Sequence, residues 1–224
     1  MSQRLPAIGA PPPQGVGADI DWSALVEQRQ AVLRHSDMPP YLLRPEIHRL
    51  LDAVERDNHR LLLDTLWHTG ARISECLALT RADFVLDARL PYASIPTLKK
   101  RGRPSRRKQH ARPRLVPLAD AAYIRSLQRY FASHSLRKNE RIWPVTRDAV
   151  NKRLHRLSAD LVPPPSVKVT PHVFRHSFAV NAVLHGIPLP VLQAWLGHAD
   201  INSTLVYTQV LALETHHLMR RIAF

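Results

Sequence analysis

Apolar side chains recur at helical spacing in the first eighty residues. Residues 22–35 predict a short helix, which the prolines of residues 37–40 end. The compact part of the chain is predicted to begin near Tyr41 and to open with further helices. Their apolar positions are Leu50, Leu51 and Val54, then Leu62, Leu63, Leu66 and Trp67, and finally Ile73, Cys76, Leu77 and Leu79. The second of these groups ends at Thr69-Gly70, which is typical of a glycine stop at a helix C-terminus.

The pattern changes between residues 84 and 118. Three short runs of β-forming residues, at 84–86, 92–98 and 115–118, predict a small antiparallel sheet. Between the last two runs lie residues 99–114, which carry nine Lys or Arg and no acid. We expect this segment to be a long, basic hairpin loop.

Helical patterns return after the sheet, each with a recognisable start. Asp120 can cap a helix through residue 131, and Thr146 or Asp148 can open another through residue 161. Three prolines then form a stiff break at residues 163–165. Thr170-Pro171 joins a capping hydroxyl to a proline at the first helical position, which predicts a helix that reaches His185 and stops at Gly186.

The remaining residues predict three more helices. Pro188 or Pro190 opens one that stops at Gly197, another follows residues 202–203, and residues 211–224 form an amphipathic pattern. The whole chain is therefore predicted to be mainly α with a small antiparallel β-sheet, an α+β fold. Residues 1–40 are expected to be an N-terminal extension. This extension is expected to be partly disordered, because residues 1–20 are rich in Pro, Gly and small residues. Residues 41–224 are expected to form the compact domain.

Charge points to an acidic partner. The 224 residues include 32 Lys or Arg and 18 Asp or Glu, a formal net charge of +14. Nucleic acid is the first candidate, because each phosphate that a cation neutralises releases counterions. An anionic membrane surface, or no polyanion at all, is the alternative on charge alone.

Cysteine and motif content narrow the classes of function. Cys76 is the only cysteine, which excludes an intramolecular disulfide and a thiolate metal cluster and favours a reducing cytoplasm. The chain has no apolar run long enough to span a membrane, and residues 1–13 lack the apolar core of a secretory signal. It also lacks a phosphate-binding loop and the H-E-x-x-H zinc motif. Neither a cofactor nor a metal is expected, since the adjacent pair His216-His217 would be a poor chelate on a helix.

Three polar segments could carry chemistry. His172 and Arg175 stand at i and i+3 near a helix start and would suit a phosphate, whereas Val173, Phe174, Ser177 and Leu184 define a separate core-facing stripe. His198 follows a glycine stop, and Tyr207 comes nine residues later. Arg72 lies just past a helix end, beside Gly70. Taken singly, the segment with His172 and Arg175 is equally compatible with a solvated polar face. A tyrosine such as Tyr207 is more often a core or surface residue, and a lone arginine in the position of Arg72 is usually a surface residue.

The order and spacing of these segments resemble the catalytic domain of the tyrosine recombinases, the family of phage integrases and Xer-type resolvases. The resemblance rests on T-G-A-R-I-S-E at 69–75, the basic hairpin, H-V-F-R-H at 172–176, and L-G-H at 196–198 followed by a tyrosine. It covers about residue 41 to the C-terminus. It implies a tyrosine recombinase catalytic-domain fold and a reaction that cuts and rejoins DNA through a 3′-phosphotyrosyl link without metal or ATP.

The resemblance also implies a role for each matching residue. Tyr207 takes the nucleophile position, and Arg72 and Arg175 match two arginines that clamp the nonbridging phosphate oxygens. His172 matches a histidine that helps to accept the tyrosine proton, and His198 matches a residue that hydrogen-bonds the phosphate. Glu75 matches an acidic residue that orients its neighbours rather than reacting.

The family also places a lysine on a β-hairpin as the general acid for the leaving 5′-oxygen. Lys100 is our choice, with Lys99 as the alternative, because this hairpin is longer than the usual form. The remaining cations of the hairpin are expected to grip DNA phosphates. These DNA-binding candidates are Lys99, Arg101, Arg103, Arg106, Arg107, Lys108, Arg112 and Arg114.

The resemblance leaves one departure and several open alternatives. Family members usually carry a helical DNA-binding domain of about a hundred residues before the catalytic domain, and this chain offers about forty there. A minimal recombinase that assembles as a tetramer on double-stranded DNA, with or without an accessory protein, is one reading. A DNA-binding protein that kept the fold without the reaction, or a type IB topoisomerase, is another. The style of the motifs favours a bacterial, plasmid or phage origin and a cytoplasmic location.

Overall fold

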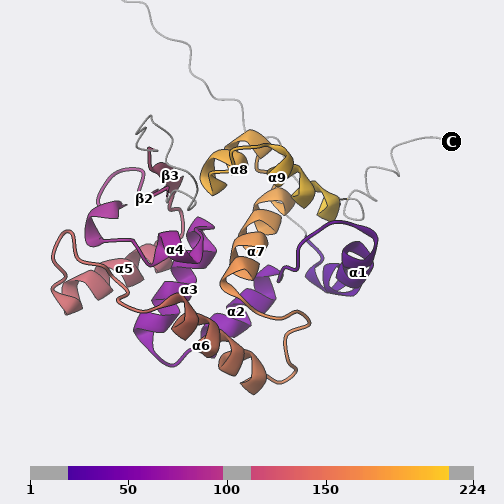
Figure 1. The fold of residues 1–224 in the computed structure, drawn as a ribbon, viewed down its shortest axis with the longest axis horizontal. Helices are drawn as coiled ribbons and strands as arrows, with labels where there is room; N and C mark the ends of the chain where they lie inside the picture. The colour runs from indigo at the N-terminus through magenta and orange to yellow at the C-terminus, as the bar shows by residue number, and fades with distance from the viewer. Residues whose placement is uncertain (1–19, 98–111, 212–224) are drawn as a thin grey trace, which may run out of the picture.

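The computed structural model describes residues 20–97 and 112–211. Its elements (Figure 1) are α1 (Trp22–His35), α2 (Arg44–Asp52), α3 (Asp57–Thr69), α4 (Ile73–Cys76), η1 (Arg81–Asp83), β1 (Phe84–Val85), β2 (Tyr92–Ile95), β3 (Arg114–Pro117), α5 (Ala121–His134), α6 (Arg147–Asp160), α7 (Pro171–Leu184), α8 (Leu189–Leu196), α9 (Asn202–Leu205) and η2 (Val206–Val210). The fold is mainly helical with a small sheet, as the sequence predicts.

Helix α7 runs through the middle of the molecule (Figure 1), with α3 to α5 and the sheet on its left, α1 on its right, and α8 and α9 over its upper end. It begins where the sequence predicts, since the hydroxyl of Thr170 accepts from the backbone N–H of Val173 and Pro171 is the first helical residue. The expected core-facing residues are all buried. Because neighbours surround α7, most of its residues are buried, including polar ones.

Two apolar clusters flank α7. The larger joins α2 to α6 and the sheet to one side of α7. The smaller joins the other side of α7 to α8, η2 and α1, with Leu25 and Val32 of α1 packed near Val180, Tyr207 and Val210. Packed side chains therefore begin before Tyr41, where the sequence pattern placed the start of the compact part.

The three strands form one antiparallel sheet in the order β1-β2-β3. The predicted strands are confirmed, but β2 ends at Ile95 and β3 begins at Arg114, which pairs with Ile95. The prediction that the hairpin loop extends through residue 114 is therefore wrong at its C-terminal end. The reason is that the Arg114 side chain turns into the protein, which a count of basic residues cannot detect.

Most helix boundaries follow the predicted capping residues. Asp120 caps α5, which continues past residue 131 to His134, and Thr146 rather than Asp148 caps α6. Gly70 and Gly197 end α3 and α8 in the left-handed conformation, with φ of 59° and 65°. One helix was expected after residues 202–203, but the chain forms the short α9 and then the 3-10 helix η2. The predicted helix at 211–224 lies almost wholly outside the described residues.

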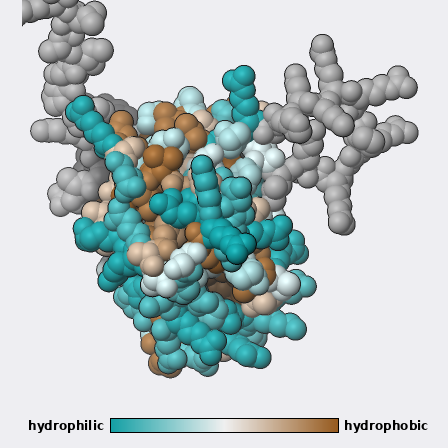
Figure 2. Space-filling model, turned by 90° about the vertical axis from the view of Figure 1, so that its left-hand side faces the viewer, coloured by the Kyte–Doolittle hydropathy of each residue, from teal (hydrophilic) through white to brown (hydrophobic). Residues whose placement is uncertain are grey.

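The surface of the molecule is largely polar. Figure 2 shows hydrophilic side chains over most of the lower part of one face and more apolar ones in its upper part. Leu90, which precedes β2, and Leu115, which lies within β3, are exposed apolar residues. Within residues 20–97 and 112–211, no helix is both long and apolar enough to cross a membrane.

An ion pair between a buried arginine and a partly exposed glutamate attaches α1 to the rest of the fold. The guanidinium of Arg29, only 1% exposed, donates to both carboxylate oxygens of Glu46 on α2 and to the hydroxyl of Ser166. Glu46 also accepts from the backbone N–H of Leu43, at 2.8 Å, at the start of α2. A single carboxylate thus serves both a helix N-terminus and the charge of a buried arginine.

We predict that Glu46→Gln lowers the free energy of unfolding by about 3 kcal/mol, because it leaves the Arg29 charge buried without a counterion. Asp52→Asn is the matched control. It removes the carboxylate of the exposed Asp52–Arg60 pair and should cost less than about 1 kcal/mol. Urea unfolding of both variants measures the difference. Equal losses would contradict a structural role for the Arg29–Glu46 pair.

Candidate active site

Arg175 is buried where three helices meet. Its side chain, 3% exposed, donates from Nη1 to the carbonyl of Gly70 at the end of α3, at 2.7 Å. It donates from Nη2 to the carbonyl of Leu196, the last residue of α8, also at 2.7 Å. Both acceptors belong to helix C-termini, whose partial negative charge stabilises a guanidinium. The arginine therefore fixes the positions of the turns that carry Arg72 and His198.

Gly70 has no room for a side chain at this junction. A Cβ built there would lie 2.5 Å from Cδ1 of Phe178 on α7, closer than carbon atoms approach. Its left-handed φ of 59° separately disfavours other residues. The turn between α3 and α4 can therefore pack directly against α7, which brings Arg72 to the site.

Arg72 and Arg114 share one carboxylate. The Glu75 side chain, which is buried, accepts from Nη1 of Arg72 at 3.0 Å and from Nη2 of Arg114 at 2.6 Å. It also accepts from the Arg72 backbone N–H at 2.9 Å, as the third residue of α4. Burial alone would raise the pKa of Glu75, but these hydrogen bonds and charges outweigh it and lower the pKa. Glu75 is therefore an ionised orienting group, and Arg72, 38% exposed, remains open to an anion.

His198 follows the glycine stop of α8. Its Nδ1 lies 2.9 Å from the hydroxyl of the buried Thr204, so Nε2 is the ring nitrogen that Thr204 does not engage. Burial, together with the charges of Arg175, Arg72 and Arg114, lowers the pKa of His198 to about 4. The imidazole is therefore neutral near pH 7 and suited to hydrogen bonding rather than to carrying charge.

Tyr207 lies in η2 with its side chain 2% exposed. Its hydroxyl is 2.8 Å from Nδ1 of His176, one residue after Arg175. Burial raises the pKa of Tyr207, and the charges of Arg175 and Arg72 oppose that rise. The phenol is thus protonated near pH 7 and already beside a nitrogen that can accept its proton.

His172 and Arg175 do not share a solvated face, so that interpretation is wrong for Arg175. His172 is exposed, whereas Arg175 is buried against two carbonyls, because α7 is enclosed by neighbours from its second turn onward. The two residues remain electrostatic neighbours. Burial first, then the charges of Arg175, Arg147 and Arg72, lower the pKa of His172.

His176 is a site residue to which the sequence pattern assigns no role. It falls within the H-V-F-R-H motif, one helical turn after His172, and the two ring centroids are 6.4 Å apart. Burial, His172 and Arg175 lower the pKa of His176 to about 4. The i, i+4 spacing of His172 and His176 was the signal available in the sequence. The tyrosine hydroxyl that His176 contacts, however, lies thirty-one residues further along the chain.

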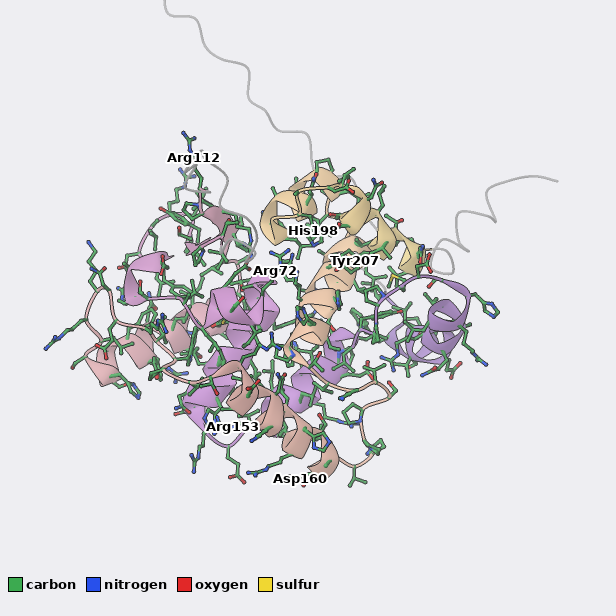
Figure 3. The ribbon with its side chains drawn as sticks, viewed as in Figure 1. Arg72, Arg112, Arg153, Asp160, His198 and Tyr207 are labelled. Carbon is green, nitrogen blue, oxygen red and sulfur yellow. The ribbon has the colours of Figure 1, made fainter. Side chains whose placement is uncertain are left out.

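The structure brings Arg72, Glu75, Arg175, His198 and Tyr207 into one region. Figure 3 shows Arg72, His198 and Tyr207 gathered between α4, α8 and α7, whereas Arg153 and Asp160 of α6 lie on the opposite side of the view. The region holds more positive than negative charge, because Glu75 is accompanied by Arg72, Arg114 and Arg175. It therefore favours the binding of an anion. Within the described part of the chain, no three metal-ligating side chains gather in one place.

Most of the predicted hairpin residues lie outside the described residues. These are Lys99, Lys100, Arg101, Arg103, Arg106, Arg107 and Lys108. Arg112 is exposed and projects away from the protein (Figure 3). Arg114 does not have the exposed position that a DNA contact requires, because its side chain is only 8% exposed and pairs with Glu75.

The chain is similar in sequence to known proteins. The Phage integrase family matches residues 40–214. A protein named Resolvase from Escherichia coli (strain K12) is 41% identical over an alignment of 232 positions, which covers 94% of this chain and 86% of that protein. Tyrosine recombinase XerC from Halalkalibacterium halodurans is 32% identical and covers 80% of this chain and 63% of its own length.

Solved structures show the same fold. The XerH site-specific recombinase bound to its difH substrate superposes with a TM-score of 0.63 and 25% identity, over 76% of this chain and 51% of the XerH chain. XerA recombinase superposes with a TM-score of 0.64 and 24% identity, over 86% of this chain and 69% of XerA. This chain thus spans about half the length of XerH. It belongs to the phage integrase family of tyrosine recombinases and has their catalytic-domain fold.

We predict that His176 makes the stability of the protein depend on pH. Its folded pKa of about 4 lies below the value near 6.5 of a free histidine, so between these values only the unfolded chain binds the proton. The free energy of unfolding should then fall as pH falls, by up to about 1.4 kcal/mol per pH unit.

Urea unfolding at pH 7 and pH 5 tests this sign. Wild type should lose about 1 to 2 kcal/mol more than His176→Gln over this interval, because the variant lacks the titrating ring. His35→Gln, which changes an exposed histidine of α1, controls for the loss of a histidine as such. An equal loss in wild type and His176→Gln would contradict the burial of a neutral His176.

Proposed function

We propose that this chain is a site-specific DNA recombinase that cuts and rejoins DNA strands through a 3′-phosphotyrosyl intermediate. The observation that carries the proposal is the position of the Tyr207 hydroxyl, within the electrostatic influence of both Arg72 and Arg175 and in contact with a neutral imidazole. A phenol, two guanidinium groups and a proton acceptor are the groups that attack on a phosphodiester requires.

In the proposed reaction the Tyr207 oxygen forms a bond to phosphorus and the bond from phosphorus to the 5′-oxygen breaks. Charge grows on the nonbridging oxygens as phosphorus becomes five-coordinate. Arg72 is partly exposed beside the site, and Arg175 is held rigidly by two carbonyls, so both charges are oriented before the substrate arrives. Such fixed charges stabilise a transition state without reorganisation during the reaction. His198 would donate a hydrogen bond to the same phosphate.

We assign the first transfer of the tyrosine proton to His176. Its Nδ1 is 2.8 Å from the Tyr207 hydroxyl, and its low pKa leaves the ring neutral near pH 7, so that Nδ1 can accept a proton in the tautomer that carries its hydrogen on Nε2. His172, which the family resemblance favoured, is exposed one turn earlier and is better placed to meet the phosphate or solvent. Lys100, or Lys99 in its place, is proposed to protonate the leaving 5′-oxygen.

Double-stranded DNA is the proposed partner. The net charge of +14, the exposed Arg112 and the basic hairpin before it support this proposal. XerH, a structural relative, is bound to its difH substrate. Strand exchange between two duplexes would require several copies of the chain, so we further propose assembly on DNA, with a tetramer as the complete form.

A catalytically silent DNA-binding protein is the second candidate. The observation that favours it is the burial of Tyr207, whose hydroxyl must become accessible before it can reach a DNA phosphate. A type IB topoisomerase would use the same chemistry but would relax supercoils without recombining sites.

We predict that the protein forms a covalent adduct on nicked duplexes drawn from its own genetic neighbourhood, and that Tyr207→Phe forms none while still binding DNA. The phenyl ring keeps the apolar packing of Tyr207 but lacks the attacking oxygen. Denaturing gels measure the adduct, and a supercoil relaxation assay separates the topoisomerase. Binding without an adduct on any duplex would favour the silent protein, and an adduct that survives Tyr207→Phe would exclude Tyr207 as the nucleophile.

A further inference from the structure

We propose that Arg114 is a positioning residue, which orients Arg72 through Glu75 and holds the turn that carries His198. This inference rests on the proposed function, because it assigns a reason for the arrangement of the phosphate-binding groups. It replaces the expectation that Arg114 is one of the DNA-gripping cations of the hairpin.

The first contact of Arg114 reaches the Arg72 side of the site. Its Nη2 donates to Oε2 of Glu75 at 2.6 Å, and Oε1 of the same carboxylate accepts from Arg72 at 3.0 Å. Because Glu75 is buried, a shift of its carboxylate would not be compensated by water. The position of the Arg72 guanidinium therefore depends on the charge and position of Arg114.

The second contact reaches the His198 side of the site. Nε of Arg114 donates to the carbonyl of Trp195 at 2.6 Å, in the last turn of α8. A Cβ built on Gly197 would lie 3.0 Å from Cδ of Arg114, so the arginine stem packs directly against that glycine. One guanidinium thus links β3 to α4 and to the turn that precedes His198. Only a branched, planar cation can make both contacts together.

The burial of Arg114 separates it from the hairpin cations. Its side chain is 8% exposed, and its Nη1 is buried with no hydrogen-bond partner within the described residues. Arg112, two residues earlier, is exposed. Arg114 is also the first residue of β3 and pairs with the buried Ile95, so the base of the basic hairpin is joined to the phosphate-binding groups.

The test compares single-turnover adduct formation on a nicked duplex at saturating DNA with DNA affinity measured across salt concentrations. The variants are Arg114→Gln, Arg114→Lys, Glu75→Gln and the double variant Arg114→Gln/Glu75→Gln. Arg125→Gln, which removes an exposed charge from α5, is the matched control. Arg112→Gln supplies the signature of a lost phosphate contact, a weaker affinity with a salt slope reduced by about one.

We expect Arg114→Gln to slow adduct formation by about a hundredfold, as small misplacements of catalytic groups do, with affinity and salt slope unchanged. Arg114→Lys should be intermediate, since it keeps a charge beside Glu75 but cannot also reach Trp195. The double variant should be no slower than the slower single variant, because both changes break one chain of contacts. Arg114→Gln should also lose activity at mildly acidic pH, where Glu75 without its partner gains a proton. Because folding stability also falls as pH falls, this loss is assigned to Glu75 only where circular dichroism shows that the variant remains folded.

Other results separate the two proposals. A normal rate with weaker, less salt-dependent binding in Arg114→Gln would assign Arg114 to the DNA contacts and overturn this inference alone. Independent, multiplying effects in the double variant would do the same. Wild type that forms no adduct would overturn the proposed function and, with it, this inference. If Arg114→Gln fails to fold, Arg114→Lys still tests the inference. An unchanged rate of adduct formation in Arg114→Lys would contradict a role for the two contacts that the guanidinium makes together.

Discussion

The rest of the site depends on the hydrogen bonds that the guanidinium of Arg175 donates to two backbone carbonyls. This guanidinium joins the C-terminal carbonyls of two helices, Gly70 after α3 and Leu196 in α8, from within the central helix α7. A buried cation is unfavourable unless such partners satisfy it, and here burial and the neighbouring arginines lower its pKa only to about 10. The charge therefore persists at neutral pH, and it fixes the two turns that present Arg72 and His198.

The same charge sets the electrostatic character of its surroundings. Burial and the positive field of the arginines keep His176 and His198 neutral, while the field opposes the rise in the pKa of Tyr207 that burial causes. An arriving phosphate would meet an excess of positive charge, a neutral hydrogen-bonding imidazole and a phenol beside its proton acceptor. Substrate binding and activation of the nucleophile then follow from one arrangement of charges rather than from separate devices.

The sequence predicted the elements better than the contacts. Helix ends could be predicted from local chemistry at Thr170-Pro171, Asp120 and Gly70, and the structure has helix ends at these residues. Arg114 and His176 show the limit. Whether an arginine beside a basic loop faces DNA or a buried carboxylate depends on which way strand β3 turns it, and the partner of His176 lies far away in the chain. Residues defined by local pattern could be predicted, whereas those defined by tertiary contact could not.

The assignment of Tyr207 as the nucleophile is tested most directly by identifying the amino acid that carries DNA in a trapped adduct. The protein would be incubated with a nicked duplex, the adduct digested with nuclease and trypsin, and the modified peptide sequenced by mass spectrometry. We predict a nucleotide joined through its 3′-phosphate to Tyr207 and to no other residue. A nucleotide on a serine, a histidine or a different tyrosine would contradict it.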